Sequence, residues 1–600
     1  MNRRSFIRQS STLAAASAVL PFVSGSYLSR RAPLSADLVI YGAGASGTTA
    51  AIQAARLGLQ VVLVENTPWV GGMLTAAGVS ALDGNKYGAG GGLVHDFRNA
   101  LADHYGGIDT LFTGWISLYC YEPHVGERIL RSMVNAEPNI TLLTQTDVVG
   151  YQRAGGEARE IMVQDHMGTT QSIETTLFLD ATEYGDGMAL AGLPYRLGRE
   201  AQHEYDEAPA PAVADLEMQD LTYAATLVEV DNPPPAPVLS DQERAYMRMF
   251  ACSTLSDCPN PDETLLNHTV HPWDMFITYA ALPNRKVLLN WPHHSNDYAV
   301  VPAFFEDRFF RKRHLAAAKL HTLQYVRYMQ SVLGHNEWQI AADEYPSEDH
   351  LPLIPYIRES RRLVNDRVMR LSDVVPLAGR PRAPWRADSI AVGDYFIDHH
   401  HANHHLPPDQ RLVEDYPANA PFQIAPNVFF PSGDDDRIMV GEKSIAISHI
   451  VNGCTRLQPP VMLMGQALGT IAHEALQSST APRETNIGRV QTKLIASGCP
   501  LYILYDISPD HPQFATLQRL AQRGILRDDD PLHAALDETI DGATATRWLH
   551  RAELSADRVD DAANTVQRRS LPEALSSRLR GRRGPLTRED VLSAIAAHLD

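Results

Sequence analysis

The chain has 600 residues, of which 44% are hydrophobic and 20% charged, a composition typical of a globular protein of two to four domains. Its net charge of −19 and pI of about 5.7 argue against nucleic acid or an anionic membrane as the main partner, because both need a basic face. Its five cysteines include no CxxC and no CxxCH, which argues against a redox dithiol and a c-type haem. Cys252 and Cys258 suit a disulfide and two separate thiols equally well.

The N-terminal segment resembles a twin-arginine export signal. Arg3 and Arg4 precede an alanine-rich apolar run from Leu13 to Val23, which is too short for a permanent membrane span. We therefore expect the twin-arginine export machinery as a partner and a periplasmic or secreted mature protein. A disordered basic tail is the alternative.

Residues 37–78 predict a nucleotide-binding βαβ unit. An apolar strand over residues 38–41 runs into a GxGxxG turn that opens a helix, and a second strand over 61–64 ends at Glu65. Gly42 permits the tight turn, Gly44 lets the backbone approach a pyrophosphate, and Gly47 lets helix and strand pack closely. Glu65 lies where a ribose hydroxyl is expected, which favours FAD or NAD. The alternative is a glycine-rich turn that only packs a helix on a sheet.

Further glycine-rich segments follow this unit. Gly71-Gly72-Met73 and a second cluster at Gly88, Gly90, Gly91 and Gly92 let backbone pass close to a flat ligand. Two β-rich runs within residues 135–165 precede an apolar strand that ends at Asp180, and a turn containing Asp186 comes next. We therefore expect the chain to return to the nucleotide sheet at this point.

The middle of the chain carries no nucleotide signature. Proline-rich connections at 208–212 and 232–237 and a helical run over 304–333 predict an inserted substrate domain. After residue 422 a strand over 437–440, Gly441-Glu442 and a helix with Gly465 and Gly469 return to the nucleotide fold. The charged last hundred residues predict a helical unit, with its boundary at Cys499-Pro500.

Together these motifs resemble the FAD-dependent oxidoreductase family, whose core is a glutathione-reductase-like flavin fold. The matching segments are the GxGxxG with Glu65, Gly71-Gly72, residues 180–186, 357–362 and 398–400, and 456–469. The resemblance implies an α/β fold: an FAD-binding Rossmann-like domain of glutathione-reductase type, an inserted α+β substrate domain and a C-terminal helical unit. The expected divisions are a signal and linker (1–33), the first part of the FAD domain (34–200), the inserted domain (201–355), returning FAD segments with the flavin-side site (356–498) and the C-terminal unit (499–600).

The resemblance also implies FAD as cofactor and assigns residues to it. The expected contacts are Gly42, Gly44, Ala45, Ser46, Gly47, Glu65, Gly71, Gly72, Met73, Val148 beside the adenine, Asp186, and Glu442 near the ribitol. A helix that begins near Gly465 and continues through Gly469 would aim its N-terminal dipole at the flavin pyrimidine. Arg456, just before that helix, would add positive charge there.

The histidines at 399, 400, 401, 404 and 405 leave three alternatives open. No carboxylate or cysteine stands at a familiar structural-zinc spacing, so no metal is predicted, although a metal site remains an alternative. His400 matches the family pattern, which makes it a candidate for flavin-side acid/base chemistry or for substrate contact. An ordinary pKa of about 6.5 suits proton transfer at neutral pH, so His400 is the candidate base. Surface histidines are the third alternative. His293-His294 suit structure or pocket lining, and Arg358, Arg361 and Arg362 suit an ion-pair network, a solvated face or a place beside the cofactor.

The predicted function is an exported FAD-dependent oxidoreductase that oxidises an organic small molecule by hydride transfer to flavin N5. The electron acceptor is not predicted. The alternatives are a flavin-dependent reductase and an envelope-binding protein with a vestigial flavin fold. The envelope-binding alternative is considered because the C-terminal tail weakly resembles an S-layer-homology unit, which would make the cell envelope a partner. The tail can also be interpreted as a helical cap on the flavoenzyme.

Overall fold

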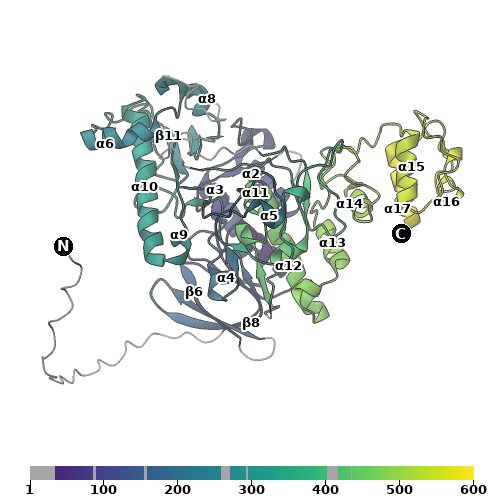
Figure 1. Ribbon diagram of the computed structural model, residues 1–600, viewed down its shortest axis with the longest axis horizontal. Coiled ribbons are helices and arrows are strands. Elements are labelled where there is room, and N and C mark those ends of the chain that lie inside the picture. The colour runs from purple at the N-terminus through teal and green to yellow at the C-terminus, as the bar shows by residue number, and fades with distance from the viewer. Residues whose placement is uncertain are drawn as a thin grey trace, which may run out of the picture.

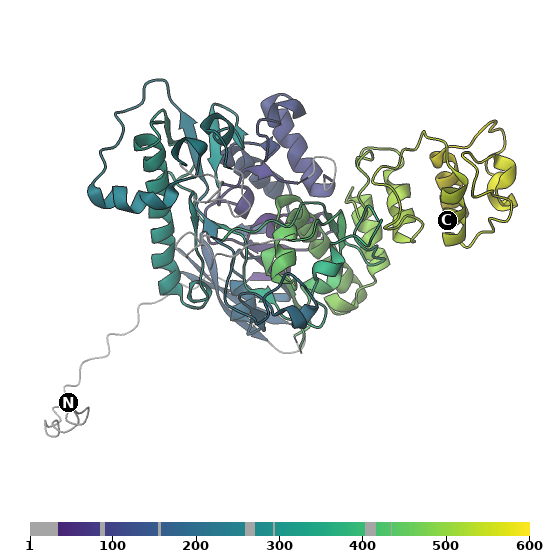
Figure 2. The ribbon, with the colours of Figure 1, turned by 45° about the horizontal axis from the view of Figure 1, so that its top comes forward.

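The computed structural model describes residues 34–84, 90–153, 158–258, 270–291, 295–401, 416–433 and 435–599. An α/β body holds most of these residues, and the last helices project from the end of the body opposite α10 (Arg308–Ser331) (Figures 1 and 2). Among the described residues, no helix is both long and apolar enough to cross a membrane.

The central sheet is mixed parallel and antiparallel. Its strands are ordered β5-β2-β1-β8-β7-β6, and β20 pairs with β8 beside this path. The first half of β8 pairs antiparallel with β7, whereas residues 178–180 at its end pair in parallel with β20. The bounds are β1 (Leu34–Tyr41), β2 (Val61–Val64), β5 (Ile140–Leu143), β6 (Thr146–Arg153), β7 (Arg159–Asp165), β8 (Thr170–Asp180) and β20 (Ile438–Val440). The parallel strands end at one edge, where a doubly wound sheet binds its ligand.

Helix α1 (Ala45–Arg56) packs between β1 and helix α12 (Gln458–Ser478). Two glycines permit the close approach of the two helices: a Cβ at Gly465 would lie 2.2 Å from the Ser46 carbonyl oxygen, and one at Gly469 2.4 Å from that of Ala50. The predicted helix start near Gly465 is therefore wrong, because α12 begins a full two turns earlier. Pro459 and Pro460 lie in its first turn, where a missing N–H costs nothing.

Smaller sheets and helices surround the nucleotide sheet. The remaining helices of the body are α2 (Gly92–Tyr105), α3 (Pro123–Asn135), α4 (Asp186–Leu190), α5 (Gln202–Tyr205), α6 (Asp241–Tyr246), α8 (Trp273–Phe276), α9 (Ala303–Glu306), α11 (His449–Thr455) and α13 (Ile487–Ala496). The short strands are β3 (Ala81–Leu82), β4 (Tyr119–Cys120), β9 (Tyr195–Arg196), β10 (Leu221–Thr222), β11 (Ala225–Glu229), β12 (Ala281–Leu282), β13 (Lys286–Leu289), β14 (Asp297–Tyr298), β15 (Trp338–Ile340), β16 (Tyr356–Ile357), β17 (Arg362–Leu363), β18 (Ala391–Gly393) and β19 (Phe422–Ile424).

Residues 201–355, which were expected to form an inserted domain, share an apolar core with the nucleotide sheet. One apolar cluster contains Leu38 of β1, Leu227 of β11 and Tyr325 of α10. The predicted helix over 304–333 is divided into α9 and α10 at Asp307, whose side chain accepts from the amides of Phe309 and Phe310 and so caps α10. Cys252 and Cys258 form a disulfide, which decides between the two alternatives left open above.

The C-terminal unit has an apolar core of its own. Its helices are α14 (Phe514–Gln522), α15 (Gly542–Arg551), α16 (Glu573–Ser576) and α17 (Arg588–Leu599), and residues such as Trp548 and Ile595 are buried among them. Arg382 of the body ties this unit down by donating to the backbone carbonyls of Ile503, Asp530 and Pro531. The helical character predicted for this segment is confirmed.

Candidate functional site

The glycine turn after β1 leaves no room for side chains. A Cβ at Gly42 would lie 2.4 Å from the Ala181 carbonyl oxygen, and one at Gly47 would lie 1.9 Å from the Gly42 oxygen. Gly42 also has a φ of 98°, which L residues rarely adopt. This close packing places the N-terminus of α1 at the carboxyl edge of the sheet, where its free N–H groups favour an anion.

A carboxylate stands at this helix N-terminus. The Ser46 amide donates to Glu442 Oε1 at 2.9 Å, and the Glu442 amide donates to Ser46 Oγ at 3.0 Å. Burial raises the pKa of Glu442 to about 7. The structure thus brings two predicted cofactor residues, Ser46 and Glu442, into direct contact although 396 positions separate them along the chain.

A small cavity opens over this turn. Five predicted residues line it, together with Glu183, Tyr184 and Ile354, which sequence reasoning did not single out. The five are Gly42, Gly44, Glu65, Gly72 and Asp186. Ala45 and Ser46 begin α1 beside it, Gly71 turns the chain into the wall with a φ of 102°, and the Met73 amide donates to Glu183 Oε1 at 3.2 Å.

Glu65 lies at the tip of β2, as predicted. Its carboxylate accepts from the amides of Ala43 and Thr67, each at 2.8 Å, which holds it against the glycine turn. Burial raises the pKa of Glu65 to about 7, against the effect of those two amides. The position at the end of the second strand is the one from which an acid contacts a ribose.

Lys443 neutralises the acids of the cavity wall. Its Nζ lies 2.5 Å from Glu183 Oε2 and 3.6 Å from Glu442 Oε2. Burial lowers the pKa of Lys443, but the two carboxylates outweigh burial and raise it, so the ammonium stays charged. Lys443 and Glu183 were not predicted as site residues, although each adjoins a motif. Lys443 follows Gly441-Glu442, and Glu183 follows Asp180-Ala181-Thr182.

A buried network of alternating charges includes both candidate catalytic residues. Arg456, between α11 and α12, donates through Nη1 to the Tyr356 hydroxyl and through Nη2 to Asp398 Oδ2 at 2.7 Å. His400 Nε2 lies 3.5 Å from the same Asp398 oxygen, and His400 Nδ1 lies 2.7 Å from Asp297 Oδ2.

The far end of this network is Arg358, whose Nη1 lies 3.1 Å from Asp297 Oδ1. Burial and the Arg358 charge lower the pKa of His400, but Asp297 and Asp398 outweigh them, so the pKa is raised. The prediction that His400 keeps an ordinary histidine pKa is therefore wrong, because its pKa lies above that value. For both aspartates burial raises the pKa, yet the facing cations lower it below its usual range.

The three predicted arginines all enter buried ion pairs. Besides the Arg358–Asp297 pair, Arg361 pairs with Asp186 at 2.7 Å, and Arg362 pairs with Glu200 and with Glu359. The ion-pair network is thus confirmed over the solvated face. Asp186 is held by Arg311 as well, so it reaches the cavity with its charge already balanced.

Some predicted residues lie away from the cavity. Val148 of β6 is fully buried in an apolar cluster with Val39 and Phe178. Gly465 and Gly469 contact the backbone of α1, so their role is in helix packing. The N-terminal end of the α12 dipole lies at Gln458, where the helix begins. His293, His294, His404, His405, Gly88 and the twin-arginine segment lie outside the described residues.

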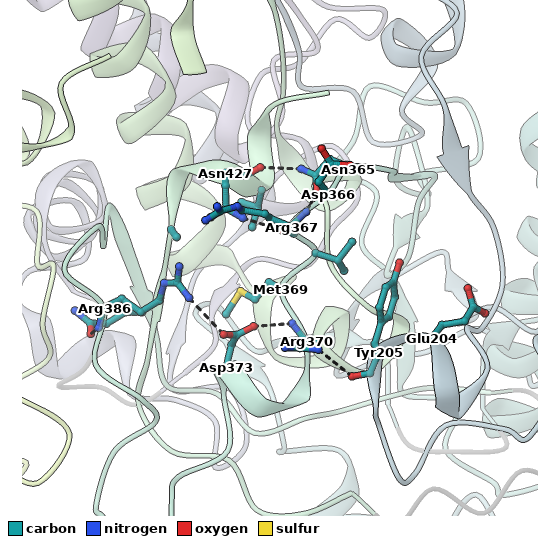
Figure 3. A pocket seen from close by; sticks show the side chains of 14 residues that line it. Glu204, Tyr205, Asn365, Asp366, Arg367, Met369, Arg370, Asp373, Arg386 and Asn427 are labelled. Atoms are coloured by element: carbon teal, nitrogen blue, oxygen red, sulfur yellow. Dashed lines mark hydrogen bonds and ion pairs between the residues drawn. The ribbon is translucent and has the colours of Figure 1, made fainter. Parts of the chain in front are cut away.

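A larger cavity lies elsewhere, beside β17 and β19, and is drawn in Figure 3. Arg367, Arg370 and Arg386 line it together with Asp373, which lies 3.4 Å from Arg386 Nη1. It contains none of the predicted site residues. The glycine turn and Glu65 therefore identify the smaller cavity as the candidate site.

The fold and this smaller cavity define a nucleotide-binding α/β protein with a Rossmann-like βαβ unit. The residues fit an FAD: the turn admits backbone only, the α1 N-terminus already holds a carboxylate as an anion, and Glu65 stands at the ribose position. A sequence model of the FAD dependent oxidoreductase family matches residues 37–494. The chain belongs to this family and is an FAD-dependent enzyme.

Solved structures give partial matches, and no curated protein matches. L-proline dehydrogenase from P. horikoshii is 17% identical over 25% of this chain and 23% of that one, with a TM-score of 0.17. OxyS anhydrotetracycline hydroxylase from Streptomyces rimosus is 13% identical over 34% and 39%, with a TM-score of 0.22. A flavoprotein/dehydrogenase from Cytophaga hutchinsonii is 16% identical over 33% and 47%, with a TM-score of 0.22. The chain spans less than half of each, and such values transfer no substrate.

Proposed function

We propose that this chain is an exported FAD-dependent dehydrogenase or oxidase that oxidises an organic small molecule. The observation that carries the proposal is the charge network of Arg456, Asp398, His400, Asp297 and Arg358. Tyr356, which accepts a hydrogen bond from Arg456, lies two residues along the chain from the cavity-lining Ile354. When bound, FAD would supply a hydride acceptor at N5.

The chain's own residues would hold the cofactor in a defined order. The backbone of the Gly42–Gly47 turn and the N-terminus of α1 would bind the pyrophosphate, and Glu65 would bind the ribose. Glu442 and Lys443 would face the ribitol from the end of β20, where Lys443 also balances the negative charge of Glu183. Arg456, fixed by Tyr356 and Asp398, would stabilise negative charge on the pyrimidine side.

His400 is proposed to take the proton that leaves the substrate. Asp297 accepts from Nδ1 and fixes the orientation of the ring, which leaves Nε2 to receive the proton beside Asp398. A carboxylate on each side stabilises the imidazolium that forms, as the aspartate does in a serine-protease triad. A buried imidazole without those carboxylates would be a weaker base.

The test begins with the absorption spectrum of the purified full-length protein. We expect bound flavin, and bleaching of that flavin under anaerobic conditions by at least one member of a panel of sugars, alcohols, amines and acids. Reduction by NADH or NADPH followed by reoxidation with an organic acceptor would instead indicate a reductase. Protein that folds without flavin, and takes none up when FAD is added, would refute an enzymatic role and favour envelope binding.

Export is the second part of the proposal. The Cys252–Cys258 disulfide supports it, since such bonds persist in oxidising compartments outside the cytoplasm. The twin-arginine machinery exports folded proteins, which suits a chain that acquires its cofactor first. Changing both Arg3 and Arg4 to Lys should leave folded, flavin-loaded protein in the cytoplasm. Undiminished periplasmic or secreted yield would refute the twin-arginine route, and retention of the mature protein by cell-wall fractions would extend the proposal to envelope contact by residues 499–600.

A further inference from the structure

His399, His401 and His449 lie together on the side of the 399–401 segment that faces away from the charge network. His400 faces Asp297 and Asp398, whereas the neighbours on either side face His449 of α11. The His449 ring centroid lies 4.6 Å from that of His399 and 5.7 Å from that of His401, and the latter two are 5.9 Å apart. One ring nitrogen of each residue lies within 4.8 Å of the other two.

We propose that His399, His401 and His449 bind a first-row transition-metal ion, with Zn²⁺ as the best match. Three imidazoles are a familiar donor set for Zn²⁺, and they leave a fourth position for water or another oxygen ligand. Zn–N bonds of about 2.0–2.1 Å place tetrahedral nitrogens roughly 3.4 Å apart, so small ring rotations would close the site.

The hydrogen bonds of two rings select the tautomers that bind metal. His449 Nδ1 lies 2.9 Å from Glu359 Oε2, so this nitrogen donates its proton to the carboxylate and Nε2 keeps its lone pair. Among the described residues, no hydrogen-bond partner reaches Nε2, although His449 is only 1% exposed. A carboxylate behind a histidine is the usual support of a metal ligand.

His399 is arranged in the same way. Its Nε2 donates to the Ile450 carbonyl at 3.1 Å, which directs the lone pair of Nδ1 to the opposite side of the ring. Its ring fits against α11 because residue 453 is glycine; a Cβ at Gly453 would lie 2.4 Å from His399 Cδ2. Helix α11 thus supplies one ligand and accommodates another.

A second cluster of potential ligands, Glu122, His124 and Glu344, differs in one respect. Lys286 Nζ already lies 2.8 Å from Glu122 Oε1 and 2.5 Å from Glu344 Oε1, so an ammonium balances those carboxylates. Neutral imidazoles carry no charge that needs such balance, and Glu359, which also pairs with Arg362, accepts a hydrogen bond from His449 on the side away from the proposed ion. The histidine cluster is therefore the site we assign.

A metal here would fasten the 399–401 segment to α11 on both sides of His400. It would act as a positioning site, because the ion would hold the backbone from which His400 reaches Asp297 and Asp398. This role rests on the proposed function of His400, whereas metal binding itself does not. The experiment therefore measures metal first and activity afterwards.

Full-length, flavin-loaded protein is treated with a chelator, exchanged into metal-free buffer and titrated with Zn²⁺ in a calorimeter. We expect one Zn²⁺ per chain, with X-ray absorption showing imidazole nitrogen ligands. His449→Ala and His401→Ala should each weaken binding at least about 100-fold, and Glu359→Gln by about 10–100-fold, the usual cost of losing the group behind a ligand. His473→Ala, a buried histidine of α12, is the matched control and should bind as the parent does.

The proposal is overturned if the parent binds none of Zn²⁺, Cu²⁺, Ni²⁺ and Fe²⁺ stoichiometrically. It is also overturned if His449→Ala retains the parent's affinity. If that variant does not fold, absorption spectra of the metal-loaded parent and the Glu359→Gln titration decide: a spectrum without imidazole scattering refutes the site. Metal binding with normal affinity alongside an inert flavin would refute the proposed function and leave the metal site standing.

Discussion

Gly44 provides the sharpest test of the phosphate cradle. A Cβ at this position would lie 2.3 Å from Glu442 Oε1 and 3.1 Å from its Cδ. The first distance is more than about 1 Å shorter than an optimal non-bonded contact of about 3.5 Å. The Glu442 carboxylate must therefore move, and its 2.9 Å bond from the Ser46 amide must break. Loss of a hydrogen bond to a charged group costs about 1.5–3 kcal/mol.

Gly44→Val is therefore expected to lower folding stability by that amount, and to weaken FAD binding through Glu442 because the carboxylate leaves its proposed place near the ribitol. The branched side chain adds a direct clash with the pyrophosphate, so we expect no flavin to survive purification. Fluorescence titration of flavin-free protein with FAD measures both effects. Gly58→Asn is the control, because Gly58 follows α1 within the same βαβ unit and a Cβ there meets no atom within 4 Å; Asn is chosen because it tolerates a positive φ, here 98°, better than most residues.

The two causes are separated by combining Gly44→Val with Glu442→Ala, which removes the oxygen that the valine would touch. If the turn cradles the pyrophosphate, the double variant binds FAD much more weakly than Glu442→Ala alone. Equal affinity of the double variant and Glu442→Ala would show that the loss came only through Glu442. That result would refute the assignment of this turn to the pyrophosphate.

Three further predictions concern stability and chemistry. Burial raises the pKa of Glu65 from 4.5 to about 7, so its stabilising effect is complete below pH 4.5 and is lost as pH rises through 7. The free energy of unfolding lost over this range is about 3 kcal/mol, at 1.36 kcal/mol per pKa unit. Glu65→Gln should therefore make the stability of the flavin-free protein depend less on pH between pH 5 and 8. Parallel pH profiles for the variant and the parent would contradict this. His400→Ala should keep FAD but slow flavin reduction about 10²-fold in a rapid-mixing measurement. Arg456→Ala should also slow flavin reduction and should lower the flavin's reduction potential. If either variant is reduced at the parent's rate, that residue has no part in the mechanism. Gly465→Ala should destabilise the protein by about 1–3 kcal/mol, because its Cβ would press on the Ser46 carbonyl oxygen at 2.2 Å; unchanged denaturation would contradict the packing role.

The nucleotide half of the fold was predictable because its signals are local. The spacing of Gly42, Gly44 and Gly47 and the position of Glu65 each follow from a few consecutive residues, and FAD and the family are confirmed. The start of α12 was mispredicted because the glycines at 465 and 469 looked like a glycine-rich helix entry. The prolines at 459 and 460 were the better signal, since the first turn of a helix tolerates them.

The charge network could not be predicted in the same way. His400 and Asp297 are 103 residues apart, and Arg456 and Asp398 are 58 apart, so only the folded chain shows which carboxylate faces which cation. The raised pKa of His400 depends on those pairs and on burial, neither of which a motif reveals. The metal-binding geometry of residues 399 and 401 likewise depends on His449, which no motif had marked.

The hydrogen bonds between Ser46 and Glu442 can form only late in the synthesis of the chain. These residues are 396 positions apart, and α1 is completed by α12, which follows Glu442. At about 5–20 residues per second, a ribosome needs roughly 20–80 s after making Ser46 before Glu442 emerges. For that interval the first βαβ unit lacks both its covering helix and the carboxylate that the Ser46 amide binds. FAD capture must therefore be a late event, and a nascent chain exported before it would leave without its cofactor.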